Sequence, residues 1–428
     1  MTKVFKFGGA SVKDADSVRN VAKIIRQYAP EKLVVVVSAM GKTTNALEKV
    51  LTAWYENDER LSVYIQEVIA YHQEIISELF PERTNPVYFN TDMLFGEMEG
   101  HLSTPPSLNY DFDYDQLVCF GELISTTIIS GYLANEGINC RLFDARELIR
   151  TDETWREGKV DWQSTQKLVE SALSPFLESG DTSKKVALTQ GFIGGTAKGA
   201  TTTLGREGSD YTAAIFAHAL NAAKMVVWKD VPGILNADPK FFENTFLLDH
   251  ISYREAIELT YYGASVIHPK TIKPLQNKGI TLCVKSFLNP DAPGTRIEPV
   301  SEDDDKTASI ILKSDQTLLS FRVKDFSFIA ENNLSDIFGA LAQCGIRINM
   351  MQQSAISFSI CFDQNNRKMD QLLRILGGKF DYRYNTGLQL ITVRHYDQPT
   401  INKLLNGRPL LLEQRSRQTA QFVVKKTN

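Results

Sequence analysis

Lys6, Gly8 and Gly9 are the first residues of this chain whose types and spacing suit chemistry. They lie in Lys3–Ser11, where an apolar strand pattern runs into two glycines before an amphipathic helix. A glycine amide can approach a phosphoryl oxygen closely, and a lysine ammonium can stabilise charge on a transferring group. The segment predicts a phosphate-binding site that also includes Ser11, although a glycine pair after a strand is equally typical of a tight turn.

A second cluster, Gly205–Asp210, precedes an apolar helix expected over Ala213–Ala223. Ser209 is expected to cap this helix, and free amides at a helix N-terminus attract anions. Arg206 offers a planar fork that suits a carboxylate. Asp210 is predicted to be functional, with the alternative that it only complements the helix dipole.

Small polar residues also follow two of the expected strands. Ser38 and Thr44 come after the apolar run Leu33–Val37, at the strand end where open α/β sheets bind ligands, or they simply cap the next helix. Asp230–Lys240 follows another strand and contains a Pro-Gly turn. This segment either wraps a nucleotide or is an ordinary surface loop.

The elements that must position these residues alternate between strand and helix patterns over about the first 290 residues. This order predicts an α/β fold with a mainly parallel central sheet sandwiched by helices, interrupted by a helical insertion at about 46–115. An acidic stretch within 299–314 is expected to be a linker. Strand and helix patterns then follow in the order strand, helix, strand, strand, helix over 315–385, and a shorter unit covers 386–428.

The composition favours a folded protein that acts on small molecules. The 428 residues are 43% hydrophobic and 23% charged, and 47 basic against 51 acidic residues give a net charge of -4, so no nucleic-acid or membrane partner is expected. Five scattered cysteines lack the spacing of a zinc or disulfide framework, and no metal site is predicted. Because a strand pattern begins at about residue 3, no N-terminal signal peptide is expected, and the predicted location is the cytoplasm.

Taken together, the clusters at 6–11, 205–210 and 230–239 resemble, in order and spacing, the aspartokinases of the amino acid kinase superfamily. Phe120–Glu122 and Tyr262–Pro269 agree with the same family. The resemblance is good over about residues 3–296. It implies transfer of the ATP γ-phosphoryl group to the side-chain carboxylate of L-aspartate, giving 4-phospho-L-aspartate, the first step toward lysine, threonine and methionine.

The resemblance also implies a role for each matched position. Lys6 and Asp210 would be catalytic, and aspartate would be held by Thr44, Glu122, Arg206 and Ser209. The ATP-binding residues would be Gly8, Gly9, Ser11, Ser38, Asp230, Leu235, Asp238 and Lys240. Mg²⁺ would arrive on the ATP phosphates rather than in a protein cage.

Several positions depart from the family pattern. Ala10 replaces a threonine, Leu235 a common tyrosine and Lys240 an arginine, while Lys229 replaces a threonine and Ser265 a lysine. An active enzyme with altered nucleotide contacts is expected. The alternative is a catalytically weak, ACT-containing amino-acid sensor, and a related kinase acting on glutamate is a lesser rival.

The C-terminal part resembles tandem ACT modules, which implies effector binding and a homodimer interface. Asn349 and Ser354 occupy the family's inhibitor-contacting stretch, but acidic residues expected there are missing. A lysine or threonine effector is therefore expected to bind differently, weakly or not at all, and a purely structural dimerisation module is the alternative. Because the chain stops at Asn428, a monofunctional enzyme is expected.

Overall fold

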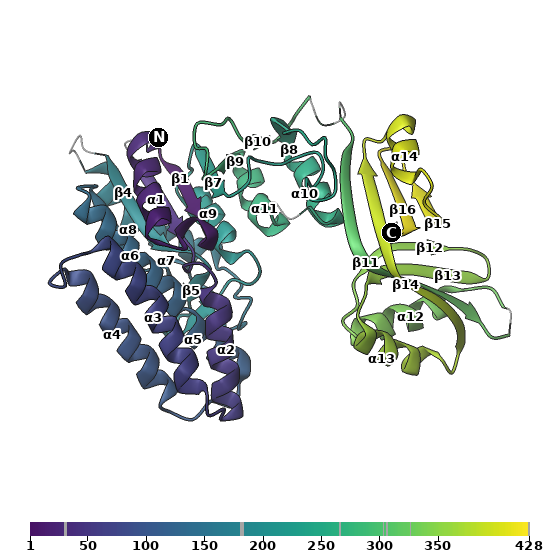
Figure 1. The fold of residues 1–428 in the computed structure, drawn as a ribbon, viewed down its shortest axis with the longest axis horizontal. Helices are drawn as coiled ribbons and strands as arrows, with labels where there is room; N and C mark the ends of the chain where they lie inside the picture. Colours follow the sequence, from purple (N-terminus) through teal and green to yellow (C-terminus); the bar gives the residue numbers. More distant parts are fainter. Residues whose placement is uncertain are drawn as a thin grey trace. The chain divides into compact units, whose positions relative to one another are not determined.

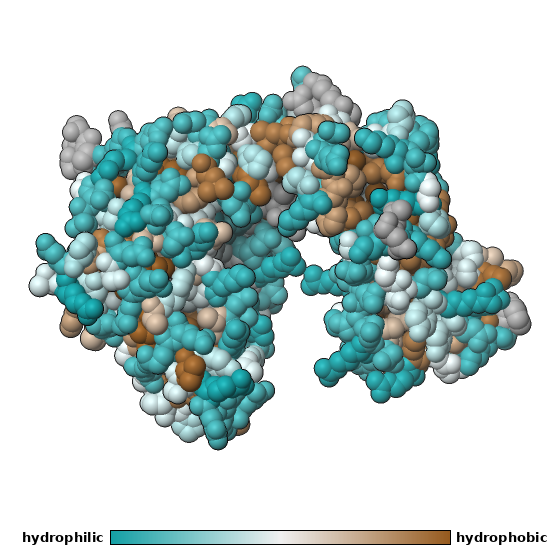
Figure 2. Space-filling view, viewed as in Figure 1, coloured by the Kyte–Doolittle hydropathy of each residue, from teal (hydrophilic) through white to brown (hydrophobic). Residues whose placement is uncertain are grey.

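The chain folds into two compact units. A computed structural model describes residues 1–426 apart from 30–31, 180–183, 265–266, 303, 305–306 and 326. The first unit comprises Met1–Ile234, Leu247–Ala256 and Val266–Ser301, and the second comprises Leu235–Phe246, Ile257–Ser265 and Glu302–Asn428. Hydrophilic residues cover most of the face shown in Figure 2, which leaves the apolar residues largely to the cores.

Figure 1 shows the strands and helices of both units. The strands of the first unit are β1 (Lys3–Phe7), β2 (Lys32–Val37), β3 (Cys140–Phe143), β4 (Lys185–Gln190), β5 (Ile193–Gly195), β6 (Thr201–Thr203), β7 (Lys224–Lys229), β8 (His250–Ser252), β9 (Thr281–Ser286) and β10 (Thr295–Glu298). Its helices are a 3₁₀ turn (Gly9–Val12), α1 (Ala15–Tyr28), α2 (Thr43–Glu56), α3 (Leu61–Leu79), α4 (Pro86–Leu102), α5 (Tyr110–Val118), α6 (Phe120–Asn135), α7 (Ala145–Leu148), α8 (Trp162–Glu178), α9 (Gly208–Ala219) and α11 (Pro269–Lys278).

The main sheet of the first unit has the order β3-β4-β2-β1-β7-β9-β10-β8. In this order, and among the described residues, each neighbouring pair from β3 to β9 is parallel, β9 and β10 are antiparallel, and β10 and β8 are parallel again. The five residues Leu33–Val37 of β2 are fully buried, as expected for a strand covered on both faces. The predicted mainly parallel sheet is confirmed.

The sequence predicted a helical insertion at about 46–115, and the helices α2, α3, α4 and α5 occupy this stretch, from Thr43 to Val118. Figure 1 shows these helices side by side with α6, and contacts among them support that arrangement. Among the described residues, the stretch Tyr110–Asn135 is long and apolar enough to cross a membrane, yet 78% of its most apolar part is buried inside the protein. This burial is typical of the core helix of a folded domain.

The second unit is built on an antiparallel sheet with the order β12-β13-β11-β14-β16-β15. Its elements are β11 (Ser309–Val323), α12 (Glu331–Gln343), β12 (Ile348–Gln353), β13 (Ser357–Asp363), α13 (Asn366–Leu376), β14 (Phe380–Arg394), α14 (Gln398–Leu405), β15 (Leu410–Arg415) and β16 (Thr419–Lys425), while α10 (Tyr253–Tyr262) supplies residues to both units. Strand β11 begins inside the predicted linker, and β14 crosses the predicted boundary at 385/386.

Candidate functional site

A cavity of about 510 Å³ lies where the carboxyl ends of β1, β2 and β7 meet the first turn of α9. It brings together eight of the predicted site residues, namely Lys6, Gly9, Ser38, Thr44, Glu122, Arg206, Ser209 and Asp210. The other lining residues are Ala39, Gly41, Tyr114, Arg156, Phe192, Thr203, Gly205, Glu207, Gly208 and Lys229. Four lysine or arginine side chains therefore line a space with three carboxyl groups, which suits anionic ligands.

Strand register explains how the two lysines of the cavity come together. On β1, Lys6 pairs with Val227 of β7, so Lys229 lies two residues further along the neighbouring strand and on the same face. Helix α9 packs against β1, β2 and β7. Its first turn places Asp210 against both lysines.

Asp210 forms ion pairs with both ammonium groups. Its Oδ1 lies 2.6 Å from Lys6 Nζ and its Oδ2 lies 3.6 Å from Lys229 Nζ, while the Asp210 side chain is only 3% exposed. Burial alone would raise the pKa of Asp210, but the charges of Lys6 and Lys229 bring it below its ordinary value. Asp210 is therefore ionised and holds the two ammonium groups at the cavity wall.

Glu122 supplies a second buried carboxyl group. Its Oε1 accepts a hydrogen bond from the Ala39 amide at 3.2 Å, and among the described residues its buried Oε2 has no hydrogen-bond partner. Burial raises the pKa of Glu122 to about 8. A buried carboxyl oxygen at a cavity wall is suited to an ammonium group of a ligand.

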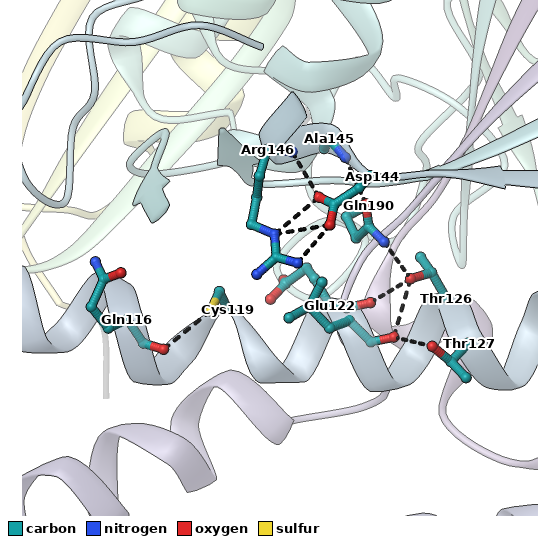
Figure 3. Close-up of polar contacts among 10 residues, drawn as sticks. Gln116, Cys119, Glu122, Thr126, Thr127, Asp144, Ala145, Arg146 and Gln190 are labelled. Atoms are coloured by element: carbon teal, nitrogen blue, oxygen red, sulfur yellow. Dashed lines mark hydrogen bonds and ion pairs between the residues drawn. The ribbon is translucent and has the colours of Figure 1, made fainter. Parts of the chain in front are cut away.

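Figure 3 shows the contacts that hold the α6 turn carrying Glu122. The Thr126 hydroxyl donates to the Glu122 carbonyl at 2.9 Å and accepts from the Gln190 amide at 2.9 Å. Gln190 in turn accepts from the backbone amide of Ala145 at 2.8 Å. This series of hydrogen bonds ties α6 to β4 and α7 and holds the backbone of the turn that carries Glu122.

Gly9 is required by close backbone packing. A Cβ at this position would lie 2.7 Å from the Gly41 carbonyl oxygen and 2.9 Å from that of Ala39. The Gly9 carbonyl also accepts from the Gly41 amide at 3.1 Å. The absence of a side chain therefore lets the loops after β1 and β2 meet, in addition to leaving Gly9 open to the cavity.

Helix α9 starts differently from the prediction. It begins at Gly208 rather than Ala213, and its N-cap is Glu207, at φ 54°, with no side-chain cap. The expectation that Ser209 caps the helix is therefore wrong. Ser209 and Asp210 lie within the first helical turn, where both side chains reach the cavity.

Arg156 was missed by the sequence analysis. Its backbone has φ 62°, its amide donates to Asp115 Oδ2 at 2.9 Å, and its guanidinium carbon lies 4.3 Å from the centre of the Tyr114 ring. Thr203 donates to the other Asp115 oxygen at 2.7 Å. Arg156 lies in an irregular loop between α7 and α8 without a motif, so no local signal marks it as a cavity residue.

Several predicted residues do not line this cavity. Ser11 is buried and its hydroxyl donates to the Trp228 carbonyl at 3.4 Å. Gly8 precedes the 3₁₀ turn as its N-cap, and Asp230 is exposed beyond β7. Their predicted contacts with ATP stay predictions.

The remaining predicted residues belong to the second unit. They are Leu235, Asp238, Lys240, Asn349 and Ser354, while Ser265 lies outside the described residues. Asp238 accepts from the Lys240 amide at 2.8 Å within a local turn. Asn349 bonds Lys313, Gln316 and Asp363 at 2.8 to 2.9 Å. In the part of the chain that the structure describes, no group of three His, Cys, Asp or Glu side chains could hold a metal ion.

The chain is similar to proteins of one known family. Residues 1–286 match the model of the amino acid kinase family. The chain is 34% identical over 369 residues to lysine-sensitive aspartokinase 3 of Escherichia coli K12, an alignment that covers 84% of this chain and 78% of the relative.

Two solved structures share the fold over nearly the whole chain. Both are Escherichia coli aspartokinase III, one in complex with lysine and aspartate (TM-score 0.84) and one with aspartate and ADP (TM-score 0.80). Each is 27% identical to this chain, with 99% of this chain and 96% of the other covered. These matches confirm the predicted fold class.

Proposed function

This chain belongs to the amino acid kinase family and, within it, to the aspartokinases, and from that premise we propose that it transfers the γ-phosphoryl group of ATP to the side-chain carboxylate of L-aspartate. The product is 4-phospho-L-aspartate. The observation that carries the proposal is the gathering of Lys6, Asp210, Arg206 and Glu122 around one cavity. The alternative of a catalytically weak sensor is not favoured, because all four of these residues line the cavity.

The charges of the cavity match those of L-aspartate. The Glu122 carboxyl group receives the α-ammonium, and the Arg206 fork receives the α-carboxylate, with Thr44 and Ser209 as further hydrogen-bonding groups. The side-chain carboxylate is left to point at ATP. Because that carboxylate is already ionised, it needs no general base.

Phosphoryl transfer then requires alignment and neutralisation of two anions. A bond forms between a carboxylate oxygen and the γ-phosphorus as the bond from that phosphorus to the β,γ-bridging oxygen breaks, and ADP leaves with the electron pair. The Lys6 ammonium stabilises charge on the transferring group, and Asp210 positions Lys6. Gly8, Gly9 and Ser38 offer backbone and hydroxyl groups to the phosphates.

The remaining nucleotide contacts rest on the family resemblance. Asp230, Leu235, Asp238 and Lys240 are proposed to bind ATP, and Ser11 to support the phosphate loop from behind. Both oxygens of Asp210 face ammonium groups, so this carboxylate does not fit the part of a metal ligand. We place Mg²⁺ on the ATP phosphates, where it would neutralise negative charge.

The proposals on regulation and assembly rest on the same family resemblance. The second unit is proposed to be ACT-like, to form a homodimer and to respond to an amino-acid end product in a cytoplasmic pathway to lysine, threonine and methionine. One relative is described as lysine-sensitive. Here the Asn349 amide bonds Lys313, Gln316 and Asp363, and the Ser354 hydroxyl lies 2.7 Å from that of Ser357, so an effector at either residue would have to displace such contacts.

ATP-dependent formation of aspartyl hydroxamate tests the proposal. The wild-type chain is expected to use L-aspartate and not L-glutamate, and Lys6→Ala should lower kcat by about 100-fold or more because it removes charge stabilisation at the phosphoryl group. Lys3→Ala, at the other end of β1, is the matched control. Wild-type protein that forms no hydroxamate at saturating ATP would overturn the proposal.

A further inference from the structure

Lys229 gives the cavity a second cation on the same carboxylate as Lys6. The two ammonium groups approach different oxygens of Asp210, at 2.6 Å for Lys6 and 3.6 Å for Lys229. One aspartate balances one lysine, so the three side chains together carry a formal charge of +1 at the cavity wall. An anionic ligand in the cavity would balance this charge.

The position of Lys229 depends on contacts of the neighbouring residue in β7. It is the last residue of β7, and it follows Trp228, whose carbonyl accepts the Ser11 hydroxyl. Trp228 stacks on Phe7 with ring centres 6.2 Å apart and planes at 4°. These contacts lock the end of β7 beside the phosphate loop after β1, so the Lys229 side chain starts from a rigid base.

The Lys229 side chain is more exposed than the two side chains beside it. Its side chain is 22% exposed, against 3% for Asp210 and 10% for Lys6, and it lines the same cavity. An ammonium has three N–H donors, so one that approaches a carboxylate can also donate to a ligand. Phosphate oxygens are suitable acceptors for a compact charge of this kind.

We propose that Lys229 is a second phosphate-binding residue, which contacts the terminal phosphates of ATP from the β7 side while Lys6 contacts them from the β1 side. Asp210 then holds both ammonium groups apart and aimed at the ligand. This inference rests on the proposed function, because it takes ATP to be the anion in the cavity.

Nucleotide titration of the full-length protein by calorimetry, with MgCl₂ present, tests the inference. The probes are AMP-PNP, a non-hydrolysable analogue that has all three phosphates, and AMP, which lacks the terminal two. Lys229→Gln should weaken AMP-PNP binding by about tenfold or more, the effect of losing one charge-assisted hydrogen bond, and leave AMP binding unchanged. Lys229→Arg, which keeps the charge, should retain most of the AMP-PNP affinity.

A matched control comes from the same strand. Lys224→Gln removes a lysine at the opposite end of β7 and should alter neither titration. If Lys229→Gln binds AMP-PNP as the wild type does, or loses AMP and AMP-PNP equally, Lys229 is only structural and the inference fails. If the wild type itself does not bind AMP-PNP, the proposed function fails instead.

A direct measurement on folded protein covers the case in which Lys229→Gln does not fold. Lysines carrying ¹³C-methyl groups are followed by NMR, and the Lys229 signal is assigned by its loss in Lys229→Arg. AMP-PNP should shift that signal and AMP should not. An unshifted signal at saturating AMP-PNP would also overturn the inference.

Discussion

Glu122 shows how a single buried side chain couples recognition to proton binding. The carboxyl group is 2% exposed and its pKa is raised to about 8, so near neutral pH the empty cavity keeps it largely protonated. The ammonium of a bound amino acid would favour the ionised form, since an opposite charge lowers a carboxyl pKa. Binding of aspartate is therefore expected to release a proton from Glu122.

Burial of Glu122 predicts a falling stability as pH rises. In the unfolded chain its pKa is near 4.5 and in the folded protein about 8, so between these values the folded state binds more protons. The free energy of unfolding then decreases with pH by up to about 1.4 kcal/mol per unit and levels off above pH 8. Glu122→Gln should flatten this slope, as urea unfolding of the substrate-free protein would show.

The effect of Glu122 on stability can be separated by pH from that of Asp115, a second buried carboxyl group. Burial raises the pKa of Asp115 to about 6, which gives a slope of the same sign at lower pH. The difference between wild type and Glu122→Gln should therefore be read above about pH 6.5. Parallel profiles of the two proteins in that window would contradict the assignment, and Glu122→Gln should also raise the KM for aspartate.

Lys6, Arg206, Asp210 and Glu122 could be predicted because each stands in a compact motif, and the fold brings all of them to the cavity. Arg156 could not be, since it reaches the cavity from a loop whose conformation depends on the distant Asp115. The residues around Arg156 in the sequence do not indicate such a contact.

At the scale of elements, the first turn of α9 is placed by contact with the end of β4. A Cβ added to Gly191 would lie 2.6 Å from Ser209 Cβ, so nothing larger than glycine fits while α9 holds its position. The apolar pattern predicted the body of α9 but not its start at Gly208. Its first residues, a glycine and two small polar residues, are held by these tertiary contacts rather than by helix propensity.

Gly191→Ala is expected to displace the first turn of α9 and with it Asp210. Overpacking at a buried site costs about 1–3 kcal/mol in stability, and loss of the 2.6 Å contact between Asp210 and Lys6 should lower kcat by about tenfold or more. Hydroxamate assays and thermal unfolding would measure both effects.

Gly100→Ala supplies the control for the same chemical change. It lies within α4, where an added Cβ would meet nothing within 4 Å, so the protein should gain up to about 1 kcal/mol and keep its activity. Full activity in Gly191→Ala would show that α9 can shift without moving Asp210, contrary to the expectation.

At the scale of the whole molecule, the sheet of the second unit joins the two predicted segments, 315–385 and 386–428, into one structure. Strands β11 and β14 pair along most of their 15 residues each, and the register shifts only near Gln316. One face carries a cluster in which Leu318 and Cys361 pack with Leu388 and Val423, from both sides of the predicted boundary. Hydrophobic periodicity predicted the separate strands, but the turn-like residues around 386 concealed the continuity of β14.

This continuity predicts that damage at one end of the sheet spreads to the other. Phe422 of β16 is fully buried against Ile391 and Ile401, so Phe422→Ala should cost about 3–5 kcal/mol. Because β14 pairs with both β16 and β11, hydrogen exchange in the full-length protein should accelerate in β11 as well as in β16. Phe328→Ala removes a ring that is 74% exposed and should leave exchange unchanged. Faster exchange confined to β16, with β11 as protected as in the wild type, would mean that the two halves open separately and that the predicted boundary at 385/386 is a real one.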